Sequence, residues 1–178
     1  GEHIPLNDLL YGMIMVSAND ASVAIAEHLD GSVANFAAHM TNRAHELGAV
    51  NSNFTNPHGL TEEEHYTTAR DLAILAAYGL KLPGFEQIVT QREAAFGWIH
   101  DDENKLLRTE NQLLYMYNGC NGIKTGYTPQ AGECLVASAS DENLDIISVV
   151  LGGKPGAGQR FSDSKKLLTY VYDHYTYQ

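Results

Sequence analysis

The chain has 178 residues, of which 44% are hydrophobic and 19% are charged, a composition that supports one folded domain with a real core. Eleven basic against twenty-two acidic residues give a formal charge of -11. That balance argues against nucleic acid and anionic membrane as main partners, because both reward clusters of Lys and Arg. No run of eighteen or more apolar residues is present, so no segment is expected to cross a bilayer as a helix.

Apolar residues recur at helical spacing through the first eighty residues and predict a mainly helical region. Asn19 or Asp20 is expected to cap the second helix, and Gly31 to end it. The expected helices cover residues 6–16, 21–29, 33–47 and 68–79, with a loop at 51–67 before the last.

The second half of the chain predicts strands followed by a closing helix. Residues 85–99 favour two weak strands, whereas 104–117 are ambiguous. Three strands joined by turns are expected over 122–127, 133–140 and 145–151, the last of them rich in Ile and Val, and a helix over 160–175 follows. The inward face of that helix is expected to carry Ser164, Leu167, Leu168, Val171 and Tyr175.

Helices, then an antiparallel meander, then a terminal helix predict an α+β fold. We interpret residues 1–178 as a single domain, with a helical region at about 6–80 and the sheet and terminal helix at about 120–176.

The two cysteines, Cys120 and Cys134, fit no metal-ligand spacing. A simple hairpin with its turn near residues 128–130 places Cys134 opposite about Thr125 and Cys120 opposite about Ala139. The two residues then lie roughly 16 Å apart along the ladder. A disulfide requires Cα atoms within about 7 Å, so two free thiols are expected.

Two short motifs carry candidate chemistry: Ser17-Ala18-Asn19 and Lys124-Thr125-Gly126. An S-x-N triplet alone is weakly specific, because Ser and Asn also cap helices. K-T-G is more specific, although a strand that ends in a Thr-Gly turn would have the same sequence.

Longer blocks surround the two motifs and strengthen them. They are Leu9-Leu10-Tyr11-Gly12-Met13, Ser17-Ala18-Asn19-Asp20-Ala21-Ser22-Val23-Ala24, Asn56-Pro57-His58-Gly59-Leu60, Thr68-Ala69-Arg70-Asp71-Leu72-Ala73, Gly122-Ile123-Lys124-Thr125-Gly126-Tyr127-Thr128, Ala131-Gly132, Arg160 and Lys165-Lys166-Leu167-Leu168. In order and spacing these blocks resemble the low-molecular-mass penicillin-binding proteins that act as D-alanyl-D-alanine carboxypeptidases, which are serine peptidases. The resemblance covers essentially the whole chain and implies a β-lactamase/transpeptidase-like fold.

The resemblance assigns catalytic roles to three residues. Ser17 would relay a proton to the leaving amine, and Asn19 would hold the substrate's peptide carbonyl with its side-chain amide. Lys124 would supply positive charge beside the leaving D-alanine.

Further residues would bind the substrate. Thr125 and Arg160 would bind its terminal carboxylate, to which an Arg fork is geometrically suited. Gly126 would let the substrate backbone approach the strand edge, and the N–H of Tyr127 would be one oxyanion donor. His58 lies in a loop that borders the active site in relatives, where it either serves function or only makes a local hydrogen bond.

The family's S-x-x-K nucleophile motif stands several tens of residues before S-x-N, but only sixteen residues precede Ser17. The literal match at 162–165 opens the expected terminal helix and has the character of a solvated helix start. We therefore expect that an N-terminal part with the nucleophile and part of the core is missing. The chain alone is then expected to be inactive, and to be stable only in association with that missing segment or by self-association.

The implied function is a serine-type D-Ala-D-Ala carboxypeptidase acting on peptidoglycan stem peptides, inhibited by β-lactam antibiotics and exported to the extracytoplasmic side. A DD-endopeptidase and a non-catalytic peptidoglycan-binding module remain alternatives. A β-lactamase is disfavoured, because no E-x-x-x-N pattern stands out after Asn51. No cofactor and no metal are expected, since His45-Glu46 begins H-E-x-x-H but position 49 is Ala.

Overall fold

The structure is a computed structural model of the chain, and it describes residues 3–98 and 101–175. The helices are α1 (Leu6–Val16), α2 (Asn19–Asp30), α3 (Val33–Glu46), α4 (Ala69–Gly79), α5 (Phe85–Val89), α6 (Leu113–Met116) and α7 (Gln159–His174). The strands are β1 (Glu93–Trp98), β2 (Asp101–Arg108), β3 (Cys120–Thr128), β4 (Gly132–Ser140) and β5 (Asp145–Gly153). In this described part of the chain, no helix is long and apolar enough to cross a membrane.

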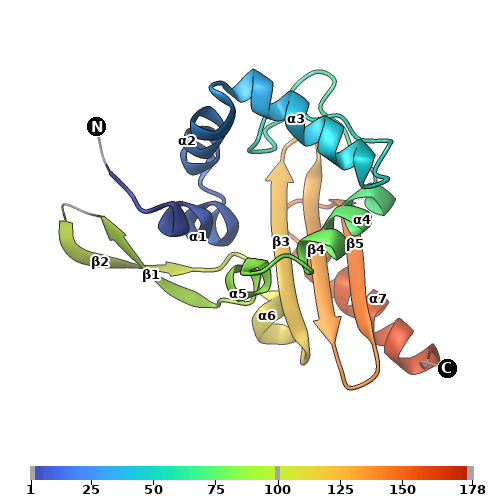
Figure 1. Cartoon of the computed structure of the whole chain (residues 1–178). Coiled ribbons are helices and arrows are strands. Elements are labelled where there is room, and N and C mark those ends of the chain that lie inside the picture. Colours follow the sequence, from blue (N-terminus) through green and yellow to red (C-terminus); the bar gives the residue numbers. More distant parts are fainter. Residues whose placement is uncertain (1–2, 99–100, 176–178) are drawn as a thin grey trace.

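The central sheet is an antiparallel meander in the order β3-β4-β5. Helix α7 lies on one face of it, and α4 and α5 lie on the other (Figure 1). Helices α1 and α2 lie on the side near β3, and α3 crosses beyond one end of the sheet (Figure 1). Strands β1 and β2 form a separate hairpin that packs beside α1 (Figure 1). The predicted α+β arrangement is confirmed.

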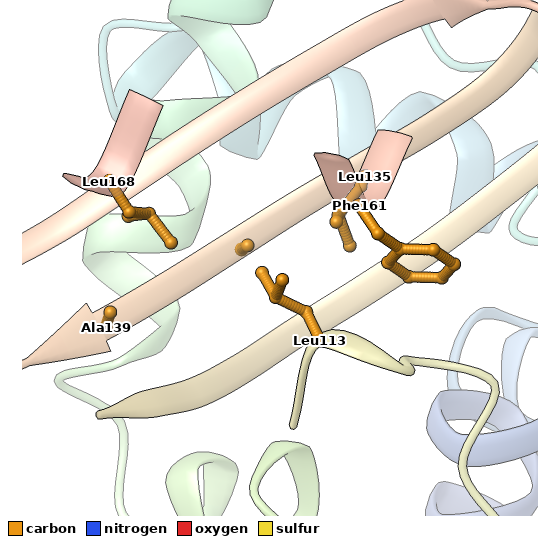
Figure 2. Packing of buried hydrophobic residues seen from close by; sticks show 6 residues of the cluster. Leu113, Leu135, Ala139, Phe161 and Leu168 are labelled. Carbon is orange, nitrogen blue, oxygen red and sulfur yellow. The ribbon is translucent and has the colours of Figure 1, made fainter. Parts of the chain in front are cut away.

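Strand β4 supplies the centre of the core on the α7 face. Because side chains of a strand alternate between faces, every second residue of β4 points toward α7 and α6 (Figure 2). The buried residues of this cluster are Leu113, Leu135, Ala137, Ala139, Phe161 and Leu168. Burial of each leucine contributes on the order of 1.5–3 kcal/mol, so this cluster stabilises the α7 face strongly.

A smaller apolar cluster covers the opposite face of the sheet. Ala76 of α4, Val89 of α5 and Ile123 of β3 are buried there. Val136 and Ile147 pack against them from the two other strands. The sheet is therefore covered on both faces, which leaves the outer edge of β3 for interactions with the α1–α2 region.

Two helices start with side-chain caps, and α2 does not. The Ser32 hydroxyl accepts from the Asn35 N–H at 3.1 Å, and the Thr68 hydroxyl accepts from the Asp71 N–H at 3.1 Å. Such caps stabilise a helix by about 1 kcal/mol. The prediction that Asn19 or Asp20 caps the second helix is wrong, because Ala18 occupies the N-cap position and makes no side-chain cap bond.

Two further sequence-based expectations are wrong in part, although β1 lies within residues 85–99 and both Ser164 and Leu168 are buried. The first of the two strands expected over 85–99 is instead the short helix α5, since a segment of five residues is too short for its pattern to separate helix from strand. On α7 the buried positions are Phe161, Ser164 and Leu168, whereas Leu167 is 47% and Tyr175 is 57% exposed. The inward stripe thus starts at residue 161, and Leu167 falls to one side of it.

The cysteine prediction is confirmed with a one-residue shift. Cys120 lies opposite Ala139 as expected, and Cys134 lies opposite Gly126 rather than Thr125. Both thiols are free.

Candidate active site

Ser17 lies in the two-residue connection between α1 and α2. Its backbone has φ 57° and ψ 40°, a left-handed conformation that non-glycine residues seldom adopt and that is frequent at functional sites. The N–H of Ala18 donates to the Gly12 carbonyl at 3.1 Å and holds this tight turn. The Ser17 hydroxyl is thereby presented to the outer edge of β3.

Lys124 of β3 meets Ser17 across a sequence separation of 107 residues. Its Nζ donates to Ser17 Oγ and also to the Thr125 carbonyl at 2.9 Å. Burial lowers the pKa of the Lys124 ammonium below its ordinary value; the Glu110 carboxylate opposes this shift, and Arg160 adds to it. The structure thus brings the S-x-N and K-T-G motifs into direct contact.

Glu110 is a member of the cluster that the sequence did not predict. Its Oε2 accepts from the Ser17 hydroxyl at 2.9 Å and from the Thr125 hydroxyl at 3.2 Å, and it lies 4.0 Å from Lys124 Nζ. The backbone N–H of Glu110 donates to the Met15 carbonyl at 3.0 Å, which fixes the residue beside the end of α1. No local pattern marks it, because this placement depends on a contact between distant segments.

Arg160 reaches β3 from the first turn of α7. Its Nη1 donates to the Gly126 carbonyl at 3.1 Å, and the guanidinium stands 4.9 Å from the centre of the Phe161 ring. Its Nε is buried and has no hydrogen-bond partner among the described residues. Thr125 is 5% exposed and Gly126 is exposed, so Arg160 and the K-T-G segment meet at the border of the sheet.

Asn19 and Tyr127 face solvent. Asn19 is the first residue of α2 and is exposed, and the Tyr127 side chain is 54% exposed. The roles predicted for the Asn19 amide and the Tyr127 N–H concern substrate contacts and stay predictions.

His58 makes a local hydrogen bond, in which its Nδ1 accepts from the Leu60 N–H at 3.2 Å. Its loop is nevertheless tied to the end of β3, since the hydroxyls of Thr61 and Thr128 share a hydrogen bond of 2.8 Å. The hydrogen bond to Leu60 supports a local structural role for His58, whereas the position of its loop beside the end of β3 supports a functional role.

The literal S-x-x-K match at the start of α7 has an ordinary helical environment. Ser162 is exposed and donates to the Gln159 carbonyl at 3.0 Å, and Lys165 is exposed as well. This matches the solvated helix start that the sequence context indicated. Among the described residues, no group of three or more metal-binding side chains is present.

A family model described as D-alanyl-D-alanine carboxypeptidase matches residues 1–155. The chain belongs to the D-alanyl-D-alanine carboxypeptidase family. The predicted family is thus confirmed over most of the sequence, and the residues at the contact of the two motifs belong to a member of that family.

Relatives of this family match the chain almost from end to end. The D-alanyl-D-alanine carboxypeptidase DacF of Bacillus subtilis is 39% identical over 175 residues, which are 98% of this chain and 44% of the relative. The D-alanyl-D-alanine endopeptidase of Escherichia coli is 31% identical over 169 residues, which are 94% of this chain and 54% of the relative. The chain therefore spans about half the length of these relatives.

A solved structure confirms the predicted penicillin-binding-protein fold. Penicillin-Binding Protein D2 from Listeria monocytogenes, in its ampicillin-bound form, superposes with a TM-score of 0.85 at 29% identity. The match covers 95% of this chain and 68% of that chain.

Proposed function

We propose that the polypeptide containing this chain is a serine-type D-Ala-D-Ala carboxypeptidase that removes the terminal D-alanine from peptidoglycan stem peptides through an acyl-enzyme. The observation that carries the proposal is the contact between Lys124 Nζ and Ser17 Oγ, which unites the two motifs at one edge of the sheet. A motif pair that only capped a helix and ended a strand would have no reason to meet in this way.

The proposed chemistry uses both residues on the leaving-group side. A serine hydroxyl attacks the carbonyl carbon of the penultimate D-alanine, and its proton passes to the lysine of the S-x-x-K motif. The bond to the terminal D-alanine then breaks. Ser17 gives its hydroxyl proton to the departing amine and takes up in its place the proton that the S-x-x-K lysine received from the nucleophile. Water hydrolyses the resulting ester and regenerates the serine. Lys124 keeps positive charge beside the relay while these bonds change.

The substrate's terminal carboxylate is proposed to lie between Thr125 and Arg160. The Thr125 hydroxyl and the Arg160 guanidinium lie at the same border of the sheet. Asn19, Gly126 and the Tyr127 N–H would complete the contacts to the peptide backbone, as the family resemblance implies.

We propose that the nucleophile belongs to a part of the polypeptide that precedes these residues. The span of 44% of DacF supports this, as does the plain helical environment of Ser162. The isolated chain is then inactive, because the catalytic residues act together and those of this chain cannot catalyse the reaction without the nucleophile.

The proposed docking site for that preceding segment is the β5 and α7 side of the molecule. Among the described strands, β5 has no partner on its outer side. The Ser148 and Ser164 hydroxyls are buried there without a hydrogen-bond partner in the described residues, and Leu151 is 41% exposed. Buried hydroxyls usually have partners, so these two fit an interface that more chain completes.

β-Lactam antibiotics are proposed as inhibitors of the complete protein, supported by the ampicillin-bound relative. Peptidoglycan lies outside the cytoplasmic membrane, so we place the protein on the extracytoplasmic side. The proposed reaction needs no metal and no organic cofactor.

A DD-endopeptidase is the second candidate, favoured by the relative named D-alanyl-D-alanine endopeptidase. It uses the same acyl-enzyme chemistry but cuts the cross-link between two stem peptides, so the second stem peptide leaves in place of free D-alanine. A peptidoglycan-binding module without catalysis would need no proton relay, so the Ser17–Lys124 contact weighs against it.

The test is the release of D-alanine from a stem pentapeptide by the full-length polypeptide and, in parallel, by this chain alone. The proposal expects release by the full-length polypeptide only. A cross-linked dimer of stem peptides is incubated in parallel, and cleavage of that dimer without release of D-alanine from the pentapeptide would support the endopeptidase. Release by this chain alone would contradict the location of the nucleophile.

A further inference from the structure

The Glu110 carboxylate occupies a place that is built for an anion. Its Oε2 receives hydrogen bonds from Ser17 and Thr125, at 2.9 and 3.2 Å, and lies 4.0 Å from the Lys124 ammonium. Two hydroxyl donors and a cation therefore converge on a single carboxylate oxygen. Charge-assisted bonds of this kind are stronger than neutral ones, so the arrangement favours a bound carboxylate.

The donors at this point have no spare protons for a second acceptor. A Ser or Thr hydroxyl carries one hydrogen, and both Ser17 and Thr125 direct theirs at Glu110. A substrate carboxylate that reached Thr125 would have to take the hydrogen bond that Glu110 now holds. Two carboxylates side by side also repel each other.

The Glu110 side chain is free to leave. Its backbone is fixed by the bond to the Met15 carbonyl, but the side chain is 50% exposed, so rotation brings the carboxylate into solvent. Lys124, Thr125 and the Arg160 guanidinium would stay behind as donors for an incoming carboxylate.

We propose that Glu110 is a specificity-determining residue, whose carboxylate fills the subsite for the ligand's terminal carboxylate and must swing out before that carboxylate binds. This inference rests on the proposed function for the identity of the ligand. Ligands with a free terminal carboxylate compete with Glu110, whereas ligands with a neutral terminal amide escape the charge repulsion. Glu110 thus lowers the affinity of the site for ligands with a terminal carboxylate relative to ligands with a neutral terminal amide.

The experiment compares two ligands and two variants in the full-length polypeptide. The ligands are an acyl-D-Ala-D-Ala peptide with a free carboxylate and the same peptide with a terminal amide. The variants are Glu110→Gln, which removes the charge, and Glu142→Gln, a matched loss of charge in the exposed turn between β4 and β5. Equilibrium affinity is measured by calorimetry, and kcat/KM is measured by product release.

Glu110→Gln is expected to raise the carboxylate-to-amide ratio on the order of tenfold in both affinity and kcat/KM, within the usual range for coupling between two ligands at linked sites. Glu142→Gln is expected to leave the ratio unchanged. An unchanged ratio in Glu110→Gln, or an equal loss for both peptides, would overturn the inference and leave Glu110 as a support for Ser17 and Lys124.

The turnover and affinity measurements distinguish failure of the proposed function from failure of the inference about Glu110. If the unmodified polypeptide turns over neither peptide, the proposed reaction fails. The affinity ratio still decides the role of Glu110, because binding requires no chemistry. If Glu110→Gln does not fold, Glu110→Asp provides the second test. Its shorter side chain retains the charge but retreats from Thr125, so the ratio is expected to rise less than in a charge-free variant and not to fall.

Discussion

The two outer strands of the central sheet are completed in different ways. At β3 the chain provides its own polar partners, since Ser17 and Glu110 close a hydrogen-bonded cluster around Lys124. At β5 the described residues leave the outer edge unpaired, and the hydroxyls of Ser148 and Ser164 are buried without partners. The leaving-group half of the proposed site is therefore already formed within this chain. The β5 and α7 side is the proposed interface with a preceding segment of the polypeptide.

Removing Lys124 breaks the prebuilt side and has the largest expected effect. Lys124→Ala deletes the Nζ contacts to Ser17 and to the Thr125 carbonyl. Acylation of the full-length polypeptide by benzylpenicillin is expected to slow about 10²–10³-fold, the usual cost of removing a preorganised electrostatic group. The rate is measured by quenched flow.

The control for this variant is Lys166→Ala, which removes an exposed lysine paired with Asp163 at 3.0 Å on the surface of α7. Equal rates in the two variants would show that Lys124 has no role in the chemistry.

Leu168 tests the apolar face that α7 shares with the sheet. Leu168→Ala is expected to lower the free energy of unfolding by about 2–5 kcal/mol, because the side chain is fully buried against β4 and leaves a cavity. Urea unfolding of the full-length polypeptide measures the loss. Leu167→Ala, one position away and 47% exposed, is expected to change it by no more than about 0.5 kcal/mol. Similar losses in both would contradict the assignment of the buried face.

Ser164 sharpens the account of the β5 and α7 side. If a preceding segment supplies a partner for its buried hydroxyl, Ser164→Ala costs the full-length polypeptide about 1 kcal/mol of unfolding free energy. Ser162→Ala, at an exposed position of the same helix, is the control. A neutral or stabilising effect of Ser164→Ala would show that the hydroxyl stays unpaired in the complete protein.

The pH dependence of acylation has the smallest expected change. Glu110 raises the pKa of Lys124, so Glu110→Gln lets that pKa fall further. If protonated Lys124 is required, activity declines as pH rises through this pKa, and the alkaline limb of the rate profile moves to lower pH in the variant. A limb that stays in place would mean that another group sets it.

The sequence predicted the elements that local patterns specify. Helix α1 has the expected bounds of residues 6–16, because its apolar stripe has a helical period. The three central strands lie where they were expected, and β5 is the one rich in Ile and Val. Helix α5 was not predicted, since a five-residue segment is too short to show a periodicity that separates helix from strand.

Motif recognition also predicted that Ser17 and Lys124 belong to one catalytic site, but it did not find Glu110. The position of Glu110 follows from its backbone bond to Met15, a tertiary contact that no spacing in the sequence encodes. In the same way, the sequence pattern of α7 did not determine which of its faces packs against β4. Phe161 lies in the buried cluster, and Leu167 lies outside it.

The most direct test of the central claim is the intact mass of the full-length polypeptide and of this chain after exposure to a penicillin. We predict one covalent adduct on the full-length polypeptide and none on this chain. An adduct on this chain would place a nucleophilic serine within these residues, with Ser162 the first to examine. No adduct on either would contradict the acyl-enzyme and favour a peptidoglycan-binding module.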